Sequence, residues 1–107
     1  MTDEEKAERQ RDLYLQRTYG ITSAEYDEIL LAQDGHCAIC PKRPTSKRRL
    51  AVDHDHRTGV VRGLLCHTCN YKLLGRRDGN PRIFLNAYWY LTSPPAIAVV
   101  GERRALS

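Results

Sequence analysis

The feature that most constrains this chain is a pair of Cys-x-x-Cys motifs. Cys37 and Cys40 form the first motif, Cys66 and Cys69 form the second, and the 107 residues contain no other cysteine. Two sulfurs from one tight turn can reach the same tetrahedral ion, and two such turns complete a closed set of four thiolates. A closed set leaves no open coordination position, so we predict a structural Zn²⁺. Two disulfides, or four free buried thiols, are the alternatives.

The composition suggests that the fold needs such a metal. Only 41% of the residues are apolar, with one Trp, one Phe and one Met, which is little for a core that must be stable on its own. No apolar run approaches the length of a membrane span, and residues 1–10 lack the pattern of a secretory signal. We therefore expect a cytoplasmic protein, and in a reducing compartment clustered cysteines favour metal binding over disulfides.

The charge is distributed unevenly along the chain. Residues 1–36 hold nine acidic and four basic groups, whereas residues 37–107 hold four acidic and thirteen basic groups. The basic part is also the part that contains every cysteine. A Zn²⁺ ion with four thiolates would contribute a charge of −2, which leaves a clear positive excess. Such a surface suits a polyanion such as nucleic acid, and a merely solvated basic surface is the alternative.

Helical patterns precede the first cysteine. Residues 3–18 predict a highly charged helix whose large apolar anchors are Leu13 and Tyr14. A capping box begins at Thr22 and predicts a second, amphipathic helix over residues 23–34. We expect this second helix to close over the apolar side of the metal region.

Between and after the cysteine pairs the pattern changes. Residues 42–49 form a basic loop without an apolar anchor, and residues 50–54 and 60–65 predict the two strands of a β-hairpin. Residues 69–77 predict a short helix after the second cysteine pair, and the turn-forming residues 78–81 follow it.

The last part of the chain predicts one further helix and a tail. Residues 81–91 begin with proline, and Pro94 and Pro95 end the pattern. Residues 96–107 show no period, so we expect a loosely ordered tail. Trp89 and Tyr90 suit a core or a dimer face equally well. The expected apolar face of this helix comprises Ile83, Phe84, Ala87, Tyr88 and Leu91.

The residues that indicate chemistry lie between the cysteine pairs. Asp53, His54, Asp55 and His56 are four consecutive side chains that can bind metal or move protons. In a regular strand Asp53 and His54 would point to opposite faces, so the strand must break near Asp53 if both act on one phosphate. Asn70 directly follows the last cysteine, and a metal bound there would hold its helix against the hairpin.

These motifs together resemble one known family. The arrangement CxIC…DHDH…GxVRGLLCxxCN, found here in residues 37–40, 53–56 and 59–70, resembles the recombination endonuclease VII family. That family is a branch of the HNH nucleases, which are also called His-Me finger or ββα-metal nucleases. Residues 19–37 are similar to the segment that leads into the family's first zinc knuckle, and the match spans about residues 19–75.

The resemblance implies an α+β fold. We expect a small zinc-stapled domain with a ββα-metal (HNH) motif and flanking helices. Residues 1–107 would form a single HNH endonuclease domain. Within it, residues 1–35 would form N-terminal helices, residues 36–77 the zinc-stapled core, and residues 78–107 a C-terminal helix and tail.

The resemblance also implies roles for single residues. Asp53 and Asn70 would bind a catalytic Mg²⁺ or Mn²⁺, and His54 would be the general base that activates water. His56 would contact or stabilise the phosphate, and no role is assigned to Asp55. The candidates for DNA backbone contacts are Arg43, Lys47, Arg48, Arg49, Arg57, Arg62, Lys72, Arg76 and Arg77.

The implied function is a metal-dependent DNA endonuclease that hydrolyses phosphodiester bonds. It would be encoded by a phage or prophage and act in the host cytoplasm on DNA, without a membrane partner. A homodimer or other phage proteins are further partners to test. One alternative is a non-catalytic zinc-containing module that binds DNA or protein, and another is a second structural metal site at residues 53–56. His36 and His67 flank the cysteines, and either replaces one as a ligand or faces solvent or DNA.

Overall fold

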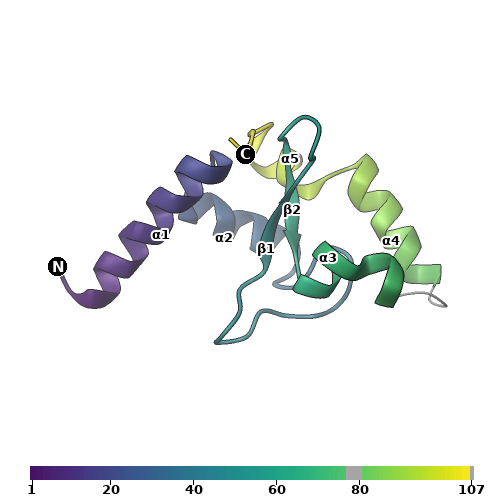
Figure 1. Cartoon of the computed structure of the whole chain (residues 1–107), viewed down its shortest axis with the longest axis horizontal. Coiled ribbons are helices and arrows are strands. Elements are labelled where there is room, and N and C mark those ends of the chain that lie inside the picture. The colour runs from purple at the N-terminus through teal and green to yellow at the C-terminus, as the bar shows by residue number, and fades with distance from the viewer. Residues whose placement is uncertain (77–80, 107) are drawn as a thin grey trace.

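Residues 1–76 and 81–106 are described by the computed structural model of this chain, with the backbone alone for residues 72–76. Within these ranges, two helices precede a two-stranded antiparallel sheet and three helices follow it. The helices lie around the hairpin, and the first helix extends away from the rest (Figure 1). This arrangement confirms the predicted α+β fold. None of the described helices has the length and apolar character needed to cross a membrane.

The hairpin forms the centre of the fold. Strand β1 (Ala51–His54) pairs with strand β2 (Val61–Leu65), and Asp53 lies opposite Gly63 in the register. The register then shifts between Asp53 and His54. Such a shift bends a strand and turns its side chains in new directions. The break that the sequence predicts near Asp53 is therefore present.

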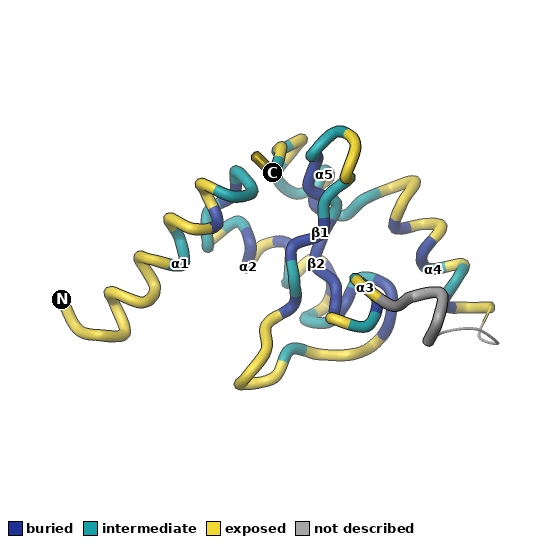
Figure 2. Tube along the Cα trace, in the orientation of Figure 1, coloured by how far each residue is buried: buried dark blue, intermediate teal, exposed yellow. Residues whose placement is uncertain are grey.

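Helix α1 (Asp3–Tyr19) contacts the rest of the described fold through its C-terminal half, beginning at Arg11 and Asp12. Its residues 3–10 are all exposed, and Leu15 is its one buried residue (Figure 2). The predicted anchors, Leu13 and Tyr14, are 46% and 49% exposed, so that prediction is wrong. Successive helical residues point about 100° apart, so Leu13 and Tyr14 lie on other faces than Leu15. The face that carries Leu15 also carries Arg11, which contacts Tyr26 of the following helix.

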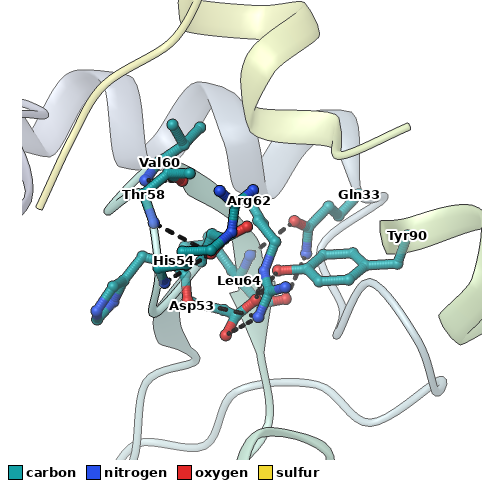
Figure 3. A network of polar contacts seen from close by, with 10 residues as sticks. Gln33, Asp53, His54, Thr58, Val60, Arg62, Leu64 and Tyr90 are labelled. Carbon is teal, nitrogen blue, oxygen red and sulfur yellow. Dashed lines mark hydrogen bonds and ion pairs between the residues drawn. The ribbon is translucent and has the colours of Figure 1, made fainter. Parts of the chain in front are cut away.

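Helix α2 (Ser23–Ala32) begins with the predicted capping box. The Glu25 backbone N–H donates to the Thr22 hydroxyl at 3.0 Å, and Glu25 accepts from the Thr22 N–H at 2.9 Å. Gln33, just past the helix, is buried and binds β2 through Leu64. Its amide donates to the Leu64 carbonyl at 2.9 Å and accepts from the Leu64 N–H at 3.0 Å (Figure 3).

Helix α3 (His67–Arg76) directly follows β2, and helix α4 (Pro81–Thr92) packs with Ile83, Ala87 and Tyr90 buried. The expected apolar face is wrong in part, because Tyr88 and Leu91 are 52% and 54% exposed. The i, i+4, i+7 spacing of the buried residues defines a face next to the expected one. The predicted turn over residues 78–81 falls mostly outside the described residues.

The tail differs most from expectation. Residues 95–100 form helix α5 (Pro95–Val100), and the residues after it run along the hairpin. The Val61 N–H donates to the Arg103 carbonyl at 2.7 Å, and the Ala105 N–H donates to the carbonyl of Gly59. Gly59 has φ +81°, and a methyl group there would lie 2.9 Å from the Ala105 carbonyl oxygen. The tail is therefore ordered by backbone hydrogen bonds that side-chain periodicity does not reveal.

Arg103 connects this tail to the start of α2. Its guanidinium donates to the Gly20 carbonyl at 3.1 Å and pairs with the Glu25 carboxylate at 3.0 Å. Burial raises the pKa of Glu25, but hydrogen bonds from Thr22 and Arg103 outweigh it and lower the pKa overall.

We predict that Arg103→Ala lowers the free energy of unfolding by about 1 kcal/mol at neutral pH. Because the pKa of Glu25 is lowered in the folded state, the ion pair stabilises the fold above the ordinary carboxyl range. This contribution is lost as pH falls through the folded-state pKa. Urea denaturation at several pH values should show the difference from wild type shrinking below about pH 4. Lys47→Ala, at an exposed site, is the control, and an equal effect of both variants would contradict the account.

Candidate functional site

The four cysteines come together from three segments. Cys37 and Cys40 lie in the turn after α2, Cys66 directly follows β2, and Cys69 lies in the first turn of α3. All four are buried, and their Sγ atoms lie within 4.8 Å of one another. The Cys40 and Cys66 Sγ atoms are 3.6 Å apart. Zinc–sulfur bonds of about 2.3 Å in a tetrahedron place the sulfurs about 3.8 Å apart, whereas a disulfide needs about 2.05 Å. The cluster is therefore compatible with a structural zinc ion.

Backbone N–H groups donate hydrogen bonds to the cysteine sulfurs and thereby favour the thiolate form. The Ile39 N–H donates to Cys37 Sγ, and the Cys69 N–H donates to Cys66 Sγ, each at 3.5 Å. A hydrogen bond from the Cys69 thiol lowers the pKa of Cys37 to about 4, and the same interaction raises the pKa of Cys69. One thiolate therefore forms readily, and a bound cation would stabilise all four.

The two flanking histidines stay outside the cluster. Among the described residues, the group that could hold a metal ion consists of the four cysteines alone. His36 Nδ1 lies 2.6 Å from the Cys37 carbonyl oxygen, and the exposed His67 ring lies 4.8 Å from the Tyr71 ring between centroids. The structure therefore does not support His36 or His67 as a metal ligand in place of a cysteine.

Asp53 is buried, and three donors contact its carboxylate (Figure 3). Arg62 Nε and the Tyr90 hydroxyl donate to Oδ2 at 2.7 Å and 2.8 Å, and Arg62 Nη2 donates to Oδ1 at 3.3 Å. Burial, and then the charge of Asp53, raise the pKa of Tyr90, so its hydroxyl keeps its proton and remains a donor. The sequence pattern does not predict this role for Tyr90, and it predicts Arg62 only as a DNA contact.

Gly63 explains how Tyr90 reaches Asp53 from α4. Gly63 faces Asp53 in the register, and a methyl group on it would lie 2.8 Å from Tyr90 Cε1 and 3.0 Å from Gln33 Oε1. The absence of a side chain thus leaves space for the Tyr90 ring to cross β2. The one sequence signal for this contact is the spacing of Tyr90 from Ile83 and Ala87.

Asp53 and Asn70 line the same cavity. It has a volume of about 270 Å³, and Arg62, Cys69 and Tyr90 also contribute to its wall. The cysteine cluster positions Asn70, because Cys69 precedes it and the Asn70 N–H donates to the Cys66 carbonyl at 2.9 Å. The structure therefore brings together the two residues that the sequence predicts as ligands of a divalent cation.

The two histidines of the motif lie beyond the register shift. The His54 and His56 rings are 4.9 Å apart between centroids, and the Tyr19 ring lies 6.1 Å from that of His54. In the part of the chain that is described, neither histidine lines the cavity of Asp53. Figure 3 shows the His54 imidazole and the Asp53 carboxylate extending from β1 in different directions.

Asp55 has a structural role that the sequence analysis did not assign. Its Oδ1 accepts hydrogen bonds from the N–H groups of Arg57 and Thr58 at 2.7 Å and 3.2 Å. The Arg57 hydrogen bond is the main cause that lowers the pKa of Asp55. Asp55 thus closes the hairpin turn in its ionised form, which is a local role typical of aspartate.

The predicted DNA contacts fall into groups. Arg62 is paired with Asp53, and Arg57 is exposed at the hairpin turn. The side chains of Lys72 and Arg76, and all of Arg77, lie outside the described residues. The remaining four candidates belong to the basic loop between the first cysteine pair and β1, and they are Arg43, Lys47, Arg48 and Arg49.

Comparison with known proteins gives a consistent result. The sequence profile of the recombination endonuclease VII family matches residues 12–93. The chain is 51% identical over 88 residues to the Gene 59 protein of Mycobacterium phage L5, covering 82% of this chain and 54% of that protein. It is 49% identical over 88 residues to the Gene 59 protein of Mycobacterium phage D29, covering 82% and 53%. The chain thus spans about half the length of these curated relatives. No solved structure matches it significantly.

We predict that Tyr90→Phe lowers the free energy of unfolding by about 2 kcal/mol, since hydrogen bonds to charged groups contribute about 1.5–3 kcal/mol. The phenyl ring would still fill the space above Gly63, so only the hydroxyl is lost. Tyr88→Phe, at an exposed position of the same helix, is the matched control and should change stability by less than about 0.5 kcal/mol. Urea denaturation of the zinc-loaded proteins measures both values. Equal midpoints for the two variants would show that the hydroxyl does not stabilise Asp53.

Proposed function

The chain belongs to the recombination endonuclease VII family, and we propose that it is a metal-dependent endonuclease of the HNH type that hydrolyses phosphodiester bonds in DNA. The observation that carries the proposal is the shared cavity of Asp53 and Asn70 beside the cysteine cluster. A carboxylate and an amide oxygen are donors that suit a hard divalent cation. The similarity to phage proteins supports a phage or prophage origin and action in the host cytoplasm.

We assign Asp53 and Asn70 as the protein ligands of Mg²⁺ or Mn²⁺. When bound, such an ion supplies Lewis-acid stabilisation of the charge that develops on the phosphate and the leaving oxygen. Asp53 Oδ2 already accepts two short hydrogen bonds, whereas Oδ1 accepts one at 3.3 Å. A carboxylate oxygen has two lone pairs, so Oδ1 is the atom that remains free for an ion. Arg62 and Tyr90 keep the carboxylate oriented.

The histidines supply the proton transfer in this proposal. His54 accepts a proton from the attacking water, because a neutral imidazole is the usual general base near neutral pH. The ring of His56 beside it contributes a second donor or acceptor for a phosphate oxygen. The shift in register at Asp53 and His54 supports different duties for these neighbours, because Asp53 lines the cavity and His54 does not.

A non-catalytic zinc-containing module is the second candidate function. It is favoured by the pairing of Asp53 with both Arg62 and Tyr90, which a purely structural ion pair would also show. Only the enzyme needs His54 and a divalent cation in addition to the zinc. Cleavage of DNA therefore separates the two functions.

We predict that His54→Ala loses plasmid cleavage by about 10²–10⁴-fold at saturating Mg²⁺ or Mn²⁺, while zinc content, fold and DNA binding stay unchanged. The rate of nicking of supercoiled plasmid is the measurement. His36→Ala is the matched control, because His36 contacts Gln33 and Cys37 rather than the hairpin. This control should retain cleavage.

Two outcomes would contradict the proposal. If His54→Ala cleaves at nearly the wild-type rate, His54 is not the base, and His56 is tested next. If the zinc-loaded wild-type protein binds DNA but cleaves it with neither cation, the non-catalytic module is the better description.

A further inference from the structure

We propose that a second pocket, separate from the Asp53 cavity, binds a DNA backbone phosphate that is not the one cleaved. This inference rests on the proposed function for its substrate. The pocket has a volume of about 370 Å³ and lies between the basic loop and the first residues of α3. We call it the cationic pocket, and its basic side chains are Lys42, Arg43, Lys47, Arg48 and Arg49.

The positive charge of this pocket has no balancing carboxylate nearby in the chain. Residues 35–52 contain no Asp or Glu, and among the described residues none of the five cations forms an ion pair. Arg43 is the one that binds backbone, since its Nη1 donates to the Asp34 carbonyl at 3.2 Å. The fold brings Asp27 of α2 into a neighbouring pocket with Arg49, so one carboxylate lies near the loop, and the five cations still leave a positive excess there.

The cysteine cluster does not remove this excess. Cys66 lies in the wall of the pocket, and four thiolates around one Zn²⁺ carry a charge of −2. Five cations exceed that charge by three. This positive excess favours an external anion with several charges, and a nucleic-acid backbone is such an anion.

Hydrogen bonds hold the backbone of the basic loop in one conformation. The Thr45 N–H donates to the Arg48 carbonyl at 2.9 Å, and the Thr45 hydroxyl accepts from the N–H groups of Lys47 and Arg48 at 3.3 Å and 3.0 Å. At the start of the loop the Cys37 N–H donates to the Lys42 carbonyl at 2.8 Å, and at its end Leu50 is buried. These contacts involve backbone atoms of Lys42, Lys47 and Arg48, so the side chains of these three residues remain available for a ligand.

The other wall suits a phosphate as well. His67 and Thr68 line the pocket at the start of α3, where the N–H groups and the helix dipole favour an anion. The hydroxyls of Thr45 and Thr68 add neutral donors at the same place. The pocket thus offers charge and hydrogen-bond donors together, which is the chemistry of phosphate recognition.

The position of most of the pocket wall favours a phosphate other than the reacting one. Leu50, in the pocket wall, directly precedes β1, and His54 is the last residue of β1. Four residues of a strand span about 13 Å, which is about four base pairs of DNA at about 3.4 Å each. A strand cleaved near His54 would therefore meet the cationic pocket several nucleotides away. The pocket would fix the position of the duplex without reading its sequence.

The test compares two double variants in the His54→Ala background, where DNA is bound but not cleaved. Lys47→Ala/Arg48→Ala removes two charges from the pocket and keeps the backbone hydrogen bonds of the loop. Lys6→Ala/Arg9→Ala removes two charges from the exposed start of α1 and is the matched control. Fluorescence anisotropy with a 30-base-pair duplex at several salt concentrations gives the affinity and its log–log salt slope.

We expect the pocket variant to reduce the salt slope by about 0.9 for each lost phosphate contact and to weaken binding about tenfold at low salt. The control should leave the slope unchanged. Equal slopes for the two double variants would overturn the proposal. If the pocket variant misfolds, as shown by its circular dichroism or zinc content, the single Lys47→Gln variant provides the same test with a smaller change.

Cleavage by the proteins that retain His54 separates this inference from the proposed function. If the wild-type protein does not cleave while the pocket variant shows the reduced salt slope, the catalytic proposal fails and the pocket stands. If the wild-type protein cleaves while both double variants match in slope, the pocket proposal fails and the catalytic proposal stands. If the wild-type protein cleaves DNA and the pocket contributes to binding, the KM of the pocket variant should be about tenfold higher than that of the wild type, with little change in kcat.

Discussion

The structure depends first on the meeting of four thiol groups from three separate segments. One buried cluster joins the turn after α2, the residue that follows β2 and the first turn of α3. Its sulfurs lie within 4.8 Å of one another. A metal ion bound there contributes its binding energy to folding, on the order of 10 kcal/mol in small domains. Because Asn70 follows Cys69, the same cluster places Asn70 in the wall of the Asp53 cavity. Fold and candidate active site therefore share one constraint.

A second set of contacts joins the outer helices to the hairpin through buried polar groups. Tyr90 reaches Asp53 from α4, and Gln33 reaches Leu64 from the end of α2. Both side chains pass close to Gly63, where a larger residue would collide with them. A buried polar group must find a partner or it destabilises the fold, so these contacts specify how the helices dock. They also leave the Asp53 carboxylate held from two sides, with Oδ1 the less occupied oxygen.

Local patterns explain what could be predicted from the sequence. The cysteine pairs, the Thr22 capping box and the hairpin each depend on residues close together in the chain, and the structure confirms all three. The role of Tyr90 could not be predicted, because Tyr88, Trp89 and Tyr90 are consecutive aromatic residues that give no preferred face. The order of the tail depends on backbone hydrogen bonds between Gly59 and Ala105, which no side-chain pattern encodes. The roles of His54, His56 and Asn70 in catalysis stay predictions.

We propose that one zinc ion at the four cysteines holds both the fold and the candidate active site together. The most direct measurement is a titration of Zn²⁺ into the metal-free protein at constant Mg²⁺, with far-UV circular dichroism and plasmid nicking followed in the same samples. Both signals should recover together and saturate at one Zn²⁺ per chain, and Cys66→Ser should recover neither. Native circular dichroism and full nicking by the chelated, zinc-free protein would contradict this proposal.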